Sequence, residues 1–274
     1  MSKVWFVTGS SRGFGRSFVE AALTRGDRVA ATARNLQSLD DLVTAYGDLV
    51  LALDMDVTDT AAVRESVTRA KEHFGRLDVI VNNAGYALFG AVEEVTEQHL
   101  RTLMETNLFG PLRVVQAALP HLREQGSGHI IQISSTAGVA AFPLGGGYCA
   151  SKWALEGLSE SLAQEVAGFD IKVTIVEPGS YATGAPTIAV KASPSPHYDA
   201  ARQAQAAYAQ TIDFGDPTAA GQAILKLADL PDPPLRVFFG TQNLSMLQQV
   251  YADRLKTWAD WLDLSAQAHA TPAL

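Results

Sequence analysis

The stretch Val4-Trp5-Phe6-Val7-Thr8-Gly9-Ser10-Ser11-Arg12-Gly13-Phe14-Gly15 places four apolar residues before a turn that contains three glycines. The apolar run predicts a buried β-strand, and the turn leads into a helical pattern from about Arg12 to Thr24. A strand, a glycine turn and a helix in this order present backbone N–H groups and the positive end of a helix dipole, which suit a pyrophosphate. The glycine spacing is Gly-x3-Gly-x-Gly instead of the commoner Gly-x-Gly-x2-Gly, so an ordinary turn between a strand and a helix is the alternative.

Six further apolar runs follow along the chain, separated by helical patterns. They are Val29 to Ala33, Leu49 to Leu53, Val79 to Val81, Ile130 to Ile133, Val173 to Val176 and Leu235 to Phe239. A continuous apolar run indicates a strand covered on both faces, and the intervening helices supply right-handed crossovers. We therefore expect a doubly wound, parallel, seven-stranded sheet, the Rossmann fold, in a single α/β domain over residues 1–274.

Composition argues against several classes of protein. The chain has 274 residues and a net charge of −8, and 47% of its residues are apolar. Nucleic acids and anionic membranes attract clustered Lys and Arg, so neither is an expected partner. The first apolar stretch is too short for a signal peptide or a membrane span, which predicts a cytoplasmic protein. Cys149 is the single cysteine, so we expect no intramolecular disulfide and no metal site.

Tyr148 and Lys152 are four residues apart in Gly-Tyr-Cys-Ala-Ser-Lys (147 to 152), thirteen residues after Ser135. In a helix over about 148–168 the two side chains share one face, with Cβ atoms roughly 5–6 Å apart. A phenol with a pKa of about 10 is a poor acid or base at neutral pH, and we expect the neighbouring ammonium to shift that pKa toward use. The alternative is a surface pair on an amphipathic helix, which the glycine turn in the same chain disfavours.

Two helical patterns carry further expectations. Pro111 lies in a helical stretch from about Glu97 to Glu124 and should kink it, which leaves Asn107 at an irregular position that faces inward. Apolar residues recur at helical spacing from Leu244 to Leu264, which predicts a packed terminal helix.

These motifs resemble the short-chain dehydrogenase/reductase family, in its short single-domain branch, over about the first 180 residues. Thr8 to Gly15 is similar to the family's cofactor turn. The catalytic tetrad of the family is matched by Asn107, Ser135, Tyr148 and Lys152. The resemblance also assigns cofactor contacts to Asp56 and Val57 at the adenine, to Asn83, Ala84 and Gly85 after the fourth strand, and to Pro178, Gly179 and Thr183 at the nicotinamide. The close of the chain resembles the 17β-hydroxysteroid-dehydrogenase-like bacterial reductases.

The resemblance implies hydride transfer between nicotinamide C4 and a carbonyl carbon, with negative charge developing on the oxygen. Ser135 would donate a hydrogen bond to that oxygen, Tyr148 would deliver the proton, and Lys152 would stabilise the phenolate and hold ribose hydroxyls. Asn107 would anchor a water that links Lys152 to solvent. Ser134 is adjacent, but the family's interval to the tyrosine selects Ser135, and neighbours at a strand end point in opposite directions.

The end of the second strand, Ala31-Thr32-Ala33-Arg34-Asn35, bears no carboxylate. An NAD site usually places an acid there for the ribose 2′-hydroxyl, about 20 residues after the glycines. Arg34, with Arg12 in the glycine turn, could instead grip a 2′-phosphate through charge-assisted hydrogen bonds. The expected cofactor is therefore NADP(H). NAD(H) use, with two solvated surface arginines, is the alternative.

Residues 184–215 lose periodicity apart from a short helix over Asp199 to Gln210, and so long a connection predicts a mobile lid over the substrate. Apolar and aromatic residues dominate the expected substrate walls, which favours a neutral, fairly hydrophobic ketone, aldehyde or alcohol. Those walls are Tyr86 to Phe89, Ala137 to Leu144, Tyr181 and the lid, whose charged residues are Lys191, Asp199, Arg202 and Asp213.

Three classes of function compete. The leading one is an NADP(H)-dependent carbonyl reductase or alcohol dehydrogenase. A non-catalytic nucleotide-sensing relative is disfavoured by the intact tetrad, and a sugar-nucleotide epimerase or dehydratase would want more than the roughly 90 residues that follow Gly179. The resemblance also implies a homo-oligomer, a dimer or a tetramer, formed through the helices at about 97–125 and 147–168.

Overall fold

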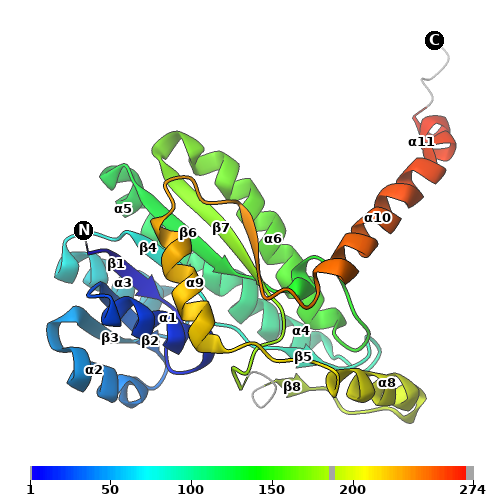
Figure 1. Ribbon diagram of the computed structural model, residues 1–274, viewed down its shortest axis with the longest axis horizontal. Coiled ribbons are helices and arrows are strands. Elements are labelled where there is room, and N and C mark those ends of the chain that lie inside the picture. Colours follow the sequence, from blue (N-terminus) through cyan, green and yellow to red (C-terminus); the bar gives the residue numbers. More distant parts are fainter. Residues whose placement is uncertain (1, 185–188, 270–274) are drawn as a thin grey trace.

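The computed structural model describes residues 2–184 and 189–269, which form a seven-stranded sheet between two layers of helices (Figure 1). The strands of the sheet are β1 (Val4–Val7), β2 (Arg28–Ala33), β3 (Val50–Asp54), β4 (Val79–Asn82), β6 (Gly128–Ile133), β7 (Ile171–Pro178) and β9 (Arg236–Phe239). They pair in parallel in the order β3-β2-β1-β4-β6-β7-β9. The predicted doubly wound Rossmann fold is confirmed, with strand ends within two residues of those expected.

Helices cover both faces of the sheet. On one side lie α1 (Gly13–Thr24), α2 (Asp40–Tyr46) and α9 (Pro217–Asp229), and on the other α3 (Thr60–Phe74), α5 (Gly110–Gln125) and α6 (Gly146–Val166). Because side chains alternate along a strand, β1 contributes to two apolar cores. Trp5 and Val7 pack with the first group of helices, and Val4 and Phe6 pack with the second. All four are fully buried, which explains the uninterrupted apolar run.

The predicted kink before α5 is a π-helical turn. α4 (Glu97–Met104) passes into α5 through Glu105–Phe109, and Pro111 lies in the first turn of α5. Proline has no N–H to donate to the carbonyl four residues earlier, which belongs to Asn107, and a wider turn accommodates the loss. Asn107 is 1% exposed, which confirms that it faces inward.

Short 3-10 helices connect several elements, at Leu36–Leu39, Gly47–Leu49, Thr136–Gly138, Ala167–Phe169 and Pro196–Tyr198. The described part of the expected lid contains α8 (Asp199–Ala209), as predicted, and β8 (Val190–Lys191), which pairs in parallel with β5 (Leu88–Phe89). The pattern missed this two-stranded sheet because each strand has only two residues. Residues 185–188 of the lid, including Pro186, lie outside the described residues.

The terminal helix was predicted to pack on the domain, and that prediction is wrong for most of its length. α10 (Leu244–Asp260) and α11 (Leu262–Ala268) extend away from the body of the protein (Figure 1). Leu247 is buried, but Leu255, Trp258 and Leu262 are more than 60% exposed. Helical spacing identifies an apolar stripe, but it does not show whether the same domain covers that stripe.

Candidate active site

The glycine turn lies between β1 and α1 at the carboxyl edge of the sheet, where ligands of open α/β sheets bind. Gly9 and Gly13 have φ of 69° and 57°, a region that side chains rarely adopt. A Cβ on Gly15 would collide with the carbonyl of Gly9 and the side-chain amide of Asn83. The glycines are therefore required by the turn itself and by its contact with the end of β4.

Asn83 and Thr8 tie the glycine turn to β4. Nδ2 of Asn83 donates to the carbonyl oxygens of Thr8 at 2.9 Å and Gly9 at 3.1 Å. Oγ1 of Thr8 accepts from the backbone N–H groups of Asn83 at 2.9 Å and Ala84 at 3.0 Å. The Asn83 side chain thus supports the turn, with its amide directed at the backbone. The sequence placed Thr8 at the start of the cofactor turn, but it did not predict that the Thr8 hydroxyl links this turn to β4.

Lys152 is one turn of α6 from Tyr148, as predicted, and it is buried. Its Nζ donates to the carbonyl oxygen of Ile133, at the end of β6, over 2.8 Å, and lies 5.9 Å from the centre of the Tyr148 ring. Lys152 is 5% exposed, and burial lowers its pKa to about 8, against the nearby charge of Glu156, which raises it. A lysine on a solvated helix surface would be exposed, so the burial and hydrogen bond of Lys152 indicate that it belongs to a functional site.

The expected effect of Lys152 on Tyr148 is not seen. Burial raises the pKa of the Tyr148 phenol, and the hydrogen bond with Ser135 acts in the opposite direction without reversing the shift. The physical reason is that desolvation penalises the phenolate, while the ammonium points to the Ile133 carbonyl. Tyr148 therefore holds its proton at neutral pH in this arrangement.

Ser134 and Ser135 point in opposite directions at the end of β6, as expected. Ser135 is the first residue of the turn that follows, and its Oγ accepts from the N–H of Ala137 at 3.1 Å while facing Tyr148. Ser134 is 4% exposed, and its Oγ has no hydrogen-bond partner among the described residues. The structure thus places Ser135, and not Ser134, with the tyrosine.

Asn107 joins the site through its side-chain amide. Its Oδ1 accepts from the N–H of Tyr86 at 3.1 Å, and its Nδ2 donates to the carbonyl of Tyr86 at 2.9 Å and to Oγ of Ser151 at 3.0 Å. Ser151 in turn donates to the carbonyl of Tyr148 at 2.8 Å. Both N–H donors of the amide are therefore used in holding two segments together, and Ser151 is a supporting residue that the sequence pattern did not reveal.

Arg12 and Arg34 are exposed, and within the described residues neither side chain makes an ion pair or a hydrogen bond. Arg16 provides a contrast, because it is paired with both Glu20 and Asp41. The charge of Arg34 also acts on Tyr86, which places it beside the site. Two arginines without acids at the end of β2 and in the glycine turn leave positive charge available to an anionic ligand.

Two cofactor segments expected from the sequence lie at the same carboxyl edge of the sheet as the turn. At the end of β3, Asp56 Oδ1 accepts from the N–H and hydroxyl of Thr58, and Val57 is buried against Gly110. The other segment follows β7: the N–H of Gly179 donates to Phe239 at 2.9 Å, just after Pro178.

The chain after Gly179 returns to the glycine turn. The rings of Phe14 and Tyr181 meet edge to face with centroids 4.8 Å apart. A Cβ on Gly13 would lie 3.2 Å from Thr183. The structure thus brings Phe14, Gly13 and Thr183 together, while Ala84 and Gly85 continue from the end of β4, with Gly85 beside Asn107 and Lys152.

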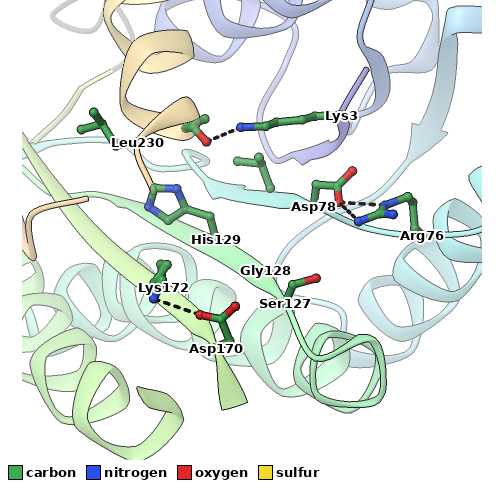
Figure 2. Close-up of a pocket in the computed structure, with 11 residues that line it drawn as sticks. Lys3, Arg76, Asp78, Ser127, Gly128, His129, Asp170, Lys172 and Leu230 are labelled. Carbon is green, nitrogen blue, oxygen red and sulfur yellow. Dashed lines mark hydrogen bonds and ion pairs between the residues drawn. The ribbon is translucent and has the colours of Figure 1, made fainter. Parts of the chain in front are cut away.

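A shallow cavity of about 250 Å³ lies at the opposite, amino edge of the sheet (Figure 2). Its cations are paired, since Lys172 contacts Asp170 at 3.0 Å and Arg76 contacts Asp78 at 2.6 Å. His129 is buried there and bonded to Thr174 over 2.9 Å. With its charges neutralised internally, the cavity is a structural feature and not a second ligand site.

An α/β sheet of this topology, with a glycine turn and a buried Tyr-Lys pair at its carboxyl edge, defines an oxidoreductase with a nucleotide-binding fold. Residues 3–193 match the family model described as short chain dehydrogenase. The chain therefore belongs to the short-chain dehydrogenase/reductase family. The part of the chain that the structure describes has no helix long and apolar enough to cross a membrane.

Comparison with relatives agrees with this family. A short-chain dehydrogenase from Streptomyces avermitilis is 40% identical, with a TM-score of 0.90, over 97% of this chain and 98% of that one. The 3-ketodihydrosphingosine reductase of Bacteroides thetaiotaomicron is 34% identical over 93% of each chain. A short chain dehydrogenase from Burkholderia cenocepacia, solved with NADP, is 28% identical with a TM-score of 0.75 over 95% and 98% of the chains. The same fold holds NAD in a more distant structure from Burkholderia phymatum.

Proposed function

We propose that the chain is an NADP(H)-dependent reductase that interconverts a ketone or aldehyde with the corresponding alcohol, using Tyr148 as acid and base. The observation that carries the proposal is the burial of Lys152, one helical turn from Tyr148, with Nζ 2.8 Å from the Ile133 carbonyl. A surface pair on an amphipathic helix would leave the ammonium in water. A nucleotide sensor without catalysis would have no use for a buried ammonium beside a protonated phenol.

Each residue of the site has a proposed part in the reaction. The nicotinamide, when bound, supplies or accepts the hydride. In reduction, Tyr148 donates its proton to the carbonyl oxygen, and Ser135 donates a hydrogen bond to the same oxygen. The positive charge of Lys152 then stabilises the phenolate that remains. Asn107 holds the helix in place through Ser151, and its proposed water link to Lys152 would return the proton from solvent.

The glycine turn fits a dinucleotide, and the arginines favour NADP(H) over NAD(H). Gly9 and Gly13 have positive φ, and the tight packing of Gly15 lets a pyrophosphate approach the backbone closely. Arg12 and Arg34 would hold the 2′-phosphate, because the end of β2 offers them no acid. The relative from Burkholderia cenocepacia that was solved with NADP supports this choice.

The proposed substrate is neutral and fairly hydrophobic. Two of the four charged lid residues are used internally, since Arg202 contacts both Glu94 at 2.7 Å and Asp199 at 2.8 Å. Lys191 and Asp213 remain to face solvent or ligand. A relative of nearly the same length is named for reduction of a long-chain keto compound, 3-ketodihydrosphingosine. This supports a ketone with an apolar body.

We further propose that the protein forms a homo-oligomer. Four apolar side chains of the C-terminal segment are each more than 60% exposed: Leu255 and Trp258 on α10, Trp261 between the helices and Leu262 on α11. Exposed apolar side chains of this kind are typical of an interface, which would add to the one expected at the helices of about 97–125 and 147–168. Sedimentation of the unmutated chain should show a dimer or tetramer, and Trp258→Glu with Leu262→Glu should weaken it. A monomer in both cases would contradict the proposal.

The 17β-hydroxysteroid-dehydrogenase-like subgroup and a cytoplasmic location are proposals that rest on the sequence.

The decisive experiment is an absorbance assay of a panel of ketones, aldehydes and alcohols with NADPH, NADH, NADP and NAD. The proposal expects turnover of apolar carbonyl compounds with NADPH. Tight NADPH binding without turnover of any compound in the panel would instead favour the sensor. Turnover with NADH alone would retain the reductase and overturn the cofactor assignment.

A further inference from the structure

A cluster of buried charged residues begins one helical turn after Lys152 on α6. Glu156 is one turn further along α6 and is 5% exposed, and Glu177 is 1% exposed at the end of β7. Arg236 at the start of β9 reaches both carboxylates: its Nε is 3.2 Å from Oε2 of Glu156 and 3.5 Å from Oε1 of Glu177. The tetrad described above does not include any of these three residues.

The group has more carboxylates than cations. Nη2 of Arg236 also contacts Oε2 of Glu160 at 2.8 Å, so one guanidinium serves three acids. Oε1 of Glu156 and Oε1 of Glu177 have no hydrogen-bond partner within the described residues. Burial and the charge of Glu156 raise the pKa of Glu177 to about 7, and burial also raises the pKa of Glu156. Burial thus makes both carboxyls harder to ionise than they are in water, and the effect is larger for Glu177.

Glu156 also borders the reacting residues. Lys152 and Glu156 are four residues apart on α6, so their side chains lie on one face of the helix, and each is 5% exposed. The charge of Glu156 raises the pKa of Lys152, in opposition to burial. A Cβ on Gly138 would lie 2.5 Å from Oγ of Ser134 and 3.1 Å from Oε1 of Glu156, so these two polar groups both border Gly138. Ser134 is the strand neighbour of Ser135. The carboxylate is thus placed on the far side of the strand end that carries the site.

We propose that Glu156 is a positioning residue for the reaction: its negative charge, one helical turn from Lys152, keeps the ammonium protonated in the buried site. The inference rests on the proposed function of Tyr148 and Lys152. The titratable and charged groups of this cluster come from three elements: Lys152, Glu156 and Glu160 on α6, Glu177 on β7 and Arg236 on β9, and the Tyr148 ring borders Lys152. Glu156 is the carboxylate among them whose charge acts on the ammonium.

The test compares Glu156→Gln with Glu160→Gln. Loss of the Glu156 charge lowers the pKa of Lys152, so the ammonium loses its proton at lower pH and the alkaline limb of the kcat/KM profile moves down by about half a pH unit or more. Glu160→Gln removes a half-exposed carboxylate that contacts the same guanidinium and should leave the limb in place. Glu177→Gln imitates the protonated acid and should also retain the limb at neutral pH. Glu156→Asp retains the negative charge on a shorter side chain, so its alkaline limb should lie between those of Glu156→Gln and the unmutated chain.

A second readout does not need turnover. NMR of ¹³C-lysine-labelled protein follows the titration of Lys152, assigned by its loss in Lys152→Arg. A lower pKa in Glu156→Gln than in the unmutated chain supports the inference, even if no substrate is turned over, in which case the proposed function fails separately. An unchanged titration of Lys152 in Glu156→Gln overturns the inference. Glu156→Met, of similar length and apolar, provides the same test if the amide variant does not fold.

Discussion

Asn107 and Ser151 are joined by a hydrogen bond of 3.0 Å, from Nδ2 to Oγ, that links the π-helical turn to the helix bearing Tyr148. Both residues are essentially buried, at 1% and 0% exposure. The link continues from Ser151 to Tyr148, because the Ser151 hydroxyl donates to the carbonyl of Tyr148 over 2.8 Å. The backbone that carries Tyr148 is therefore fixed from the neighbouring element and not from α6 alone.

Removing this link should cost both stability and activity. Ser151→Ala leaves one donor of the buried Asn107 amide without a partner, which is worth about 1–3 kcal/mol of unfolding free energy. We also expect a lower kcat, because α6 loses its tie to the π-helical turn. Urea unfolding and steady-state kinetics measure the two effects. Ser159→Ala is the matched control, since Ser159 is equally buried on α6 but bonds only to Leu155. Equal kcat in the two variants would contradict a positioning role.

Tyr148→Phe should abolish turnover and leave cofactor affinity nearly unchanged, because it removes only the proton-donating hydroxyl. Lys152→Ala should reduce both, since its ammonium is proposed to hold ribose hydroxyls as well as to stabilise the phenolate. The measurements are kcat/KM with an active carbonyl substrate and NADPH titration by fluorescence. If Tyr148→Phe retains more than about a tenth of kcat/KM, a loss below about 1.4 kcal/mol in transition-state terms, Tyr148 is not the acid.

The unmutated chain should prefer NADPH to NADH by roughly ten- to a hundred-fold, because charge-assisted hydrogen bonds contribute about 1.5–3 kcal/mol each. Arg34→Asp should weaken NADPH binding and retain or improve NADH binding. Arg69→Asp makes the same charge change on an exposed part of α3 and serves as the control for net charge. Equal titration curves for the two cofactors in the unmutated chain would refute the assignment.

Acid should destabilise the protein through His129. Burial, with smaller effects from Lys3 and Lys172, lowers the pKa of His129 from 6.5 to about 4. The unfolded chain therefore binds a proton that the folded chain does not, and stability falls as the pH drops from about 6.5 to 4, by about 3 kcal/mol at most. His129→Gln does not titrate and should lose less stability between pH 7 and 5. Identical pH dependence of the two midpoints in urea would exclude His129 as the cause.

The parts of the fold that could be predicted are those whose signal is local. The glycine turn and the apolar strands need only nearby residues, and the four-residue interval from Tyr148 to Lys152 fixes a shared helix face. The parts that failed depend on distant chain segments. The stripe of α10 repeats as expected, yet the domain does not cover most of it, and the rise in the pKa of Tyr148 follows from burial that spacing does not encode. Ser151 and Glu156 had no motif to mark them.

The last prediction concerns the lid, whose described part is held in several places by the buried carboxylate of Glu94. Glu94 is buried at its carboxylate, where Oε2 accepts from the N–H of Ala91 at 2.8 Å and Oε1 accepts from Ser195 at 2.5 Å and from Arg202 at 2.7 Å. These bonds lower the pKa of Glu94 to about 2, so the anchor persists throughout the neutral range. The lid should thus move about a fixed point.

Hydrogen exchange measures that motion. In the free protein we expect Glu94→Gln to speed exchange over residues 195–209, because the charged partner of Arg202 is lost. Glu93→Gln is the matched control: its neighbouring carboxylate accepts only from the hydroxyl of Tyr198, at 2.5 Å and in an exposed position. NADPH with substrate should slow exchange in the unmutated chain, since Tyr208 and Phe214 are 60% and 48% exposed and free to cover a ligand. Unchanged protection in the bound state would show that residues 189–215 form a static wall and that substrate choice is made elsewhere.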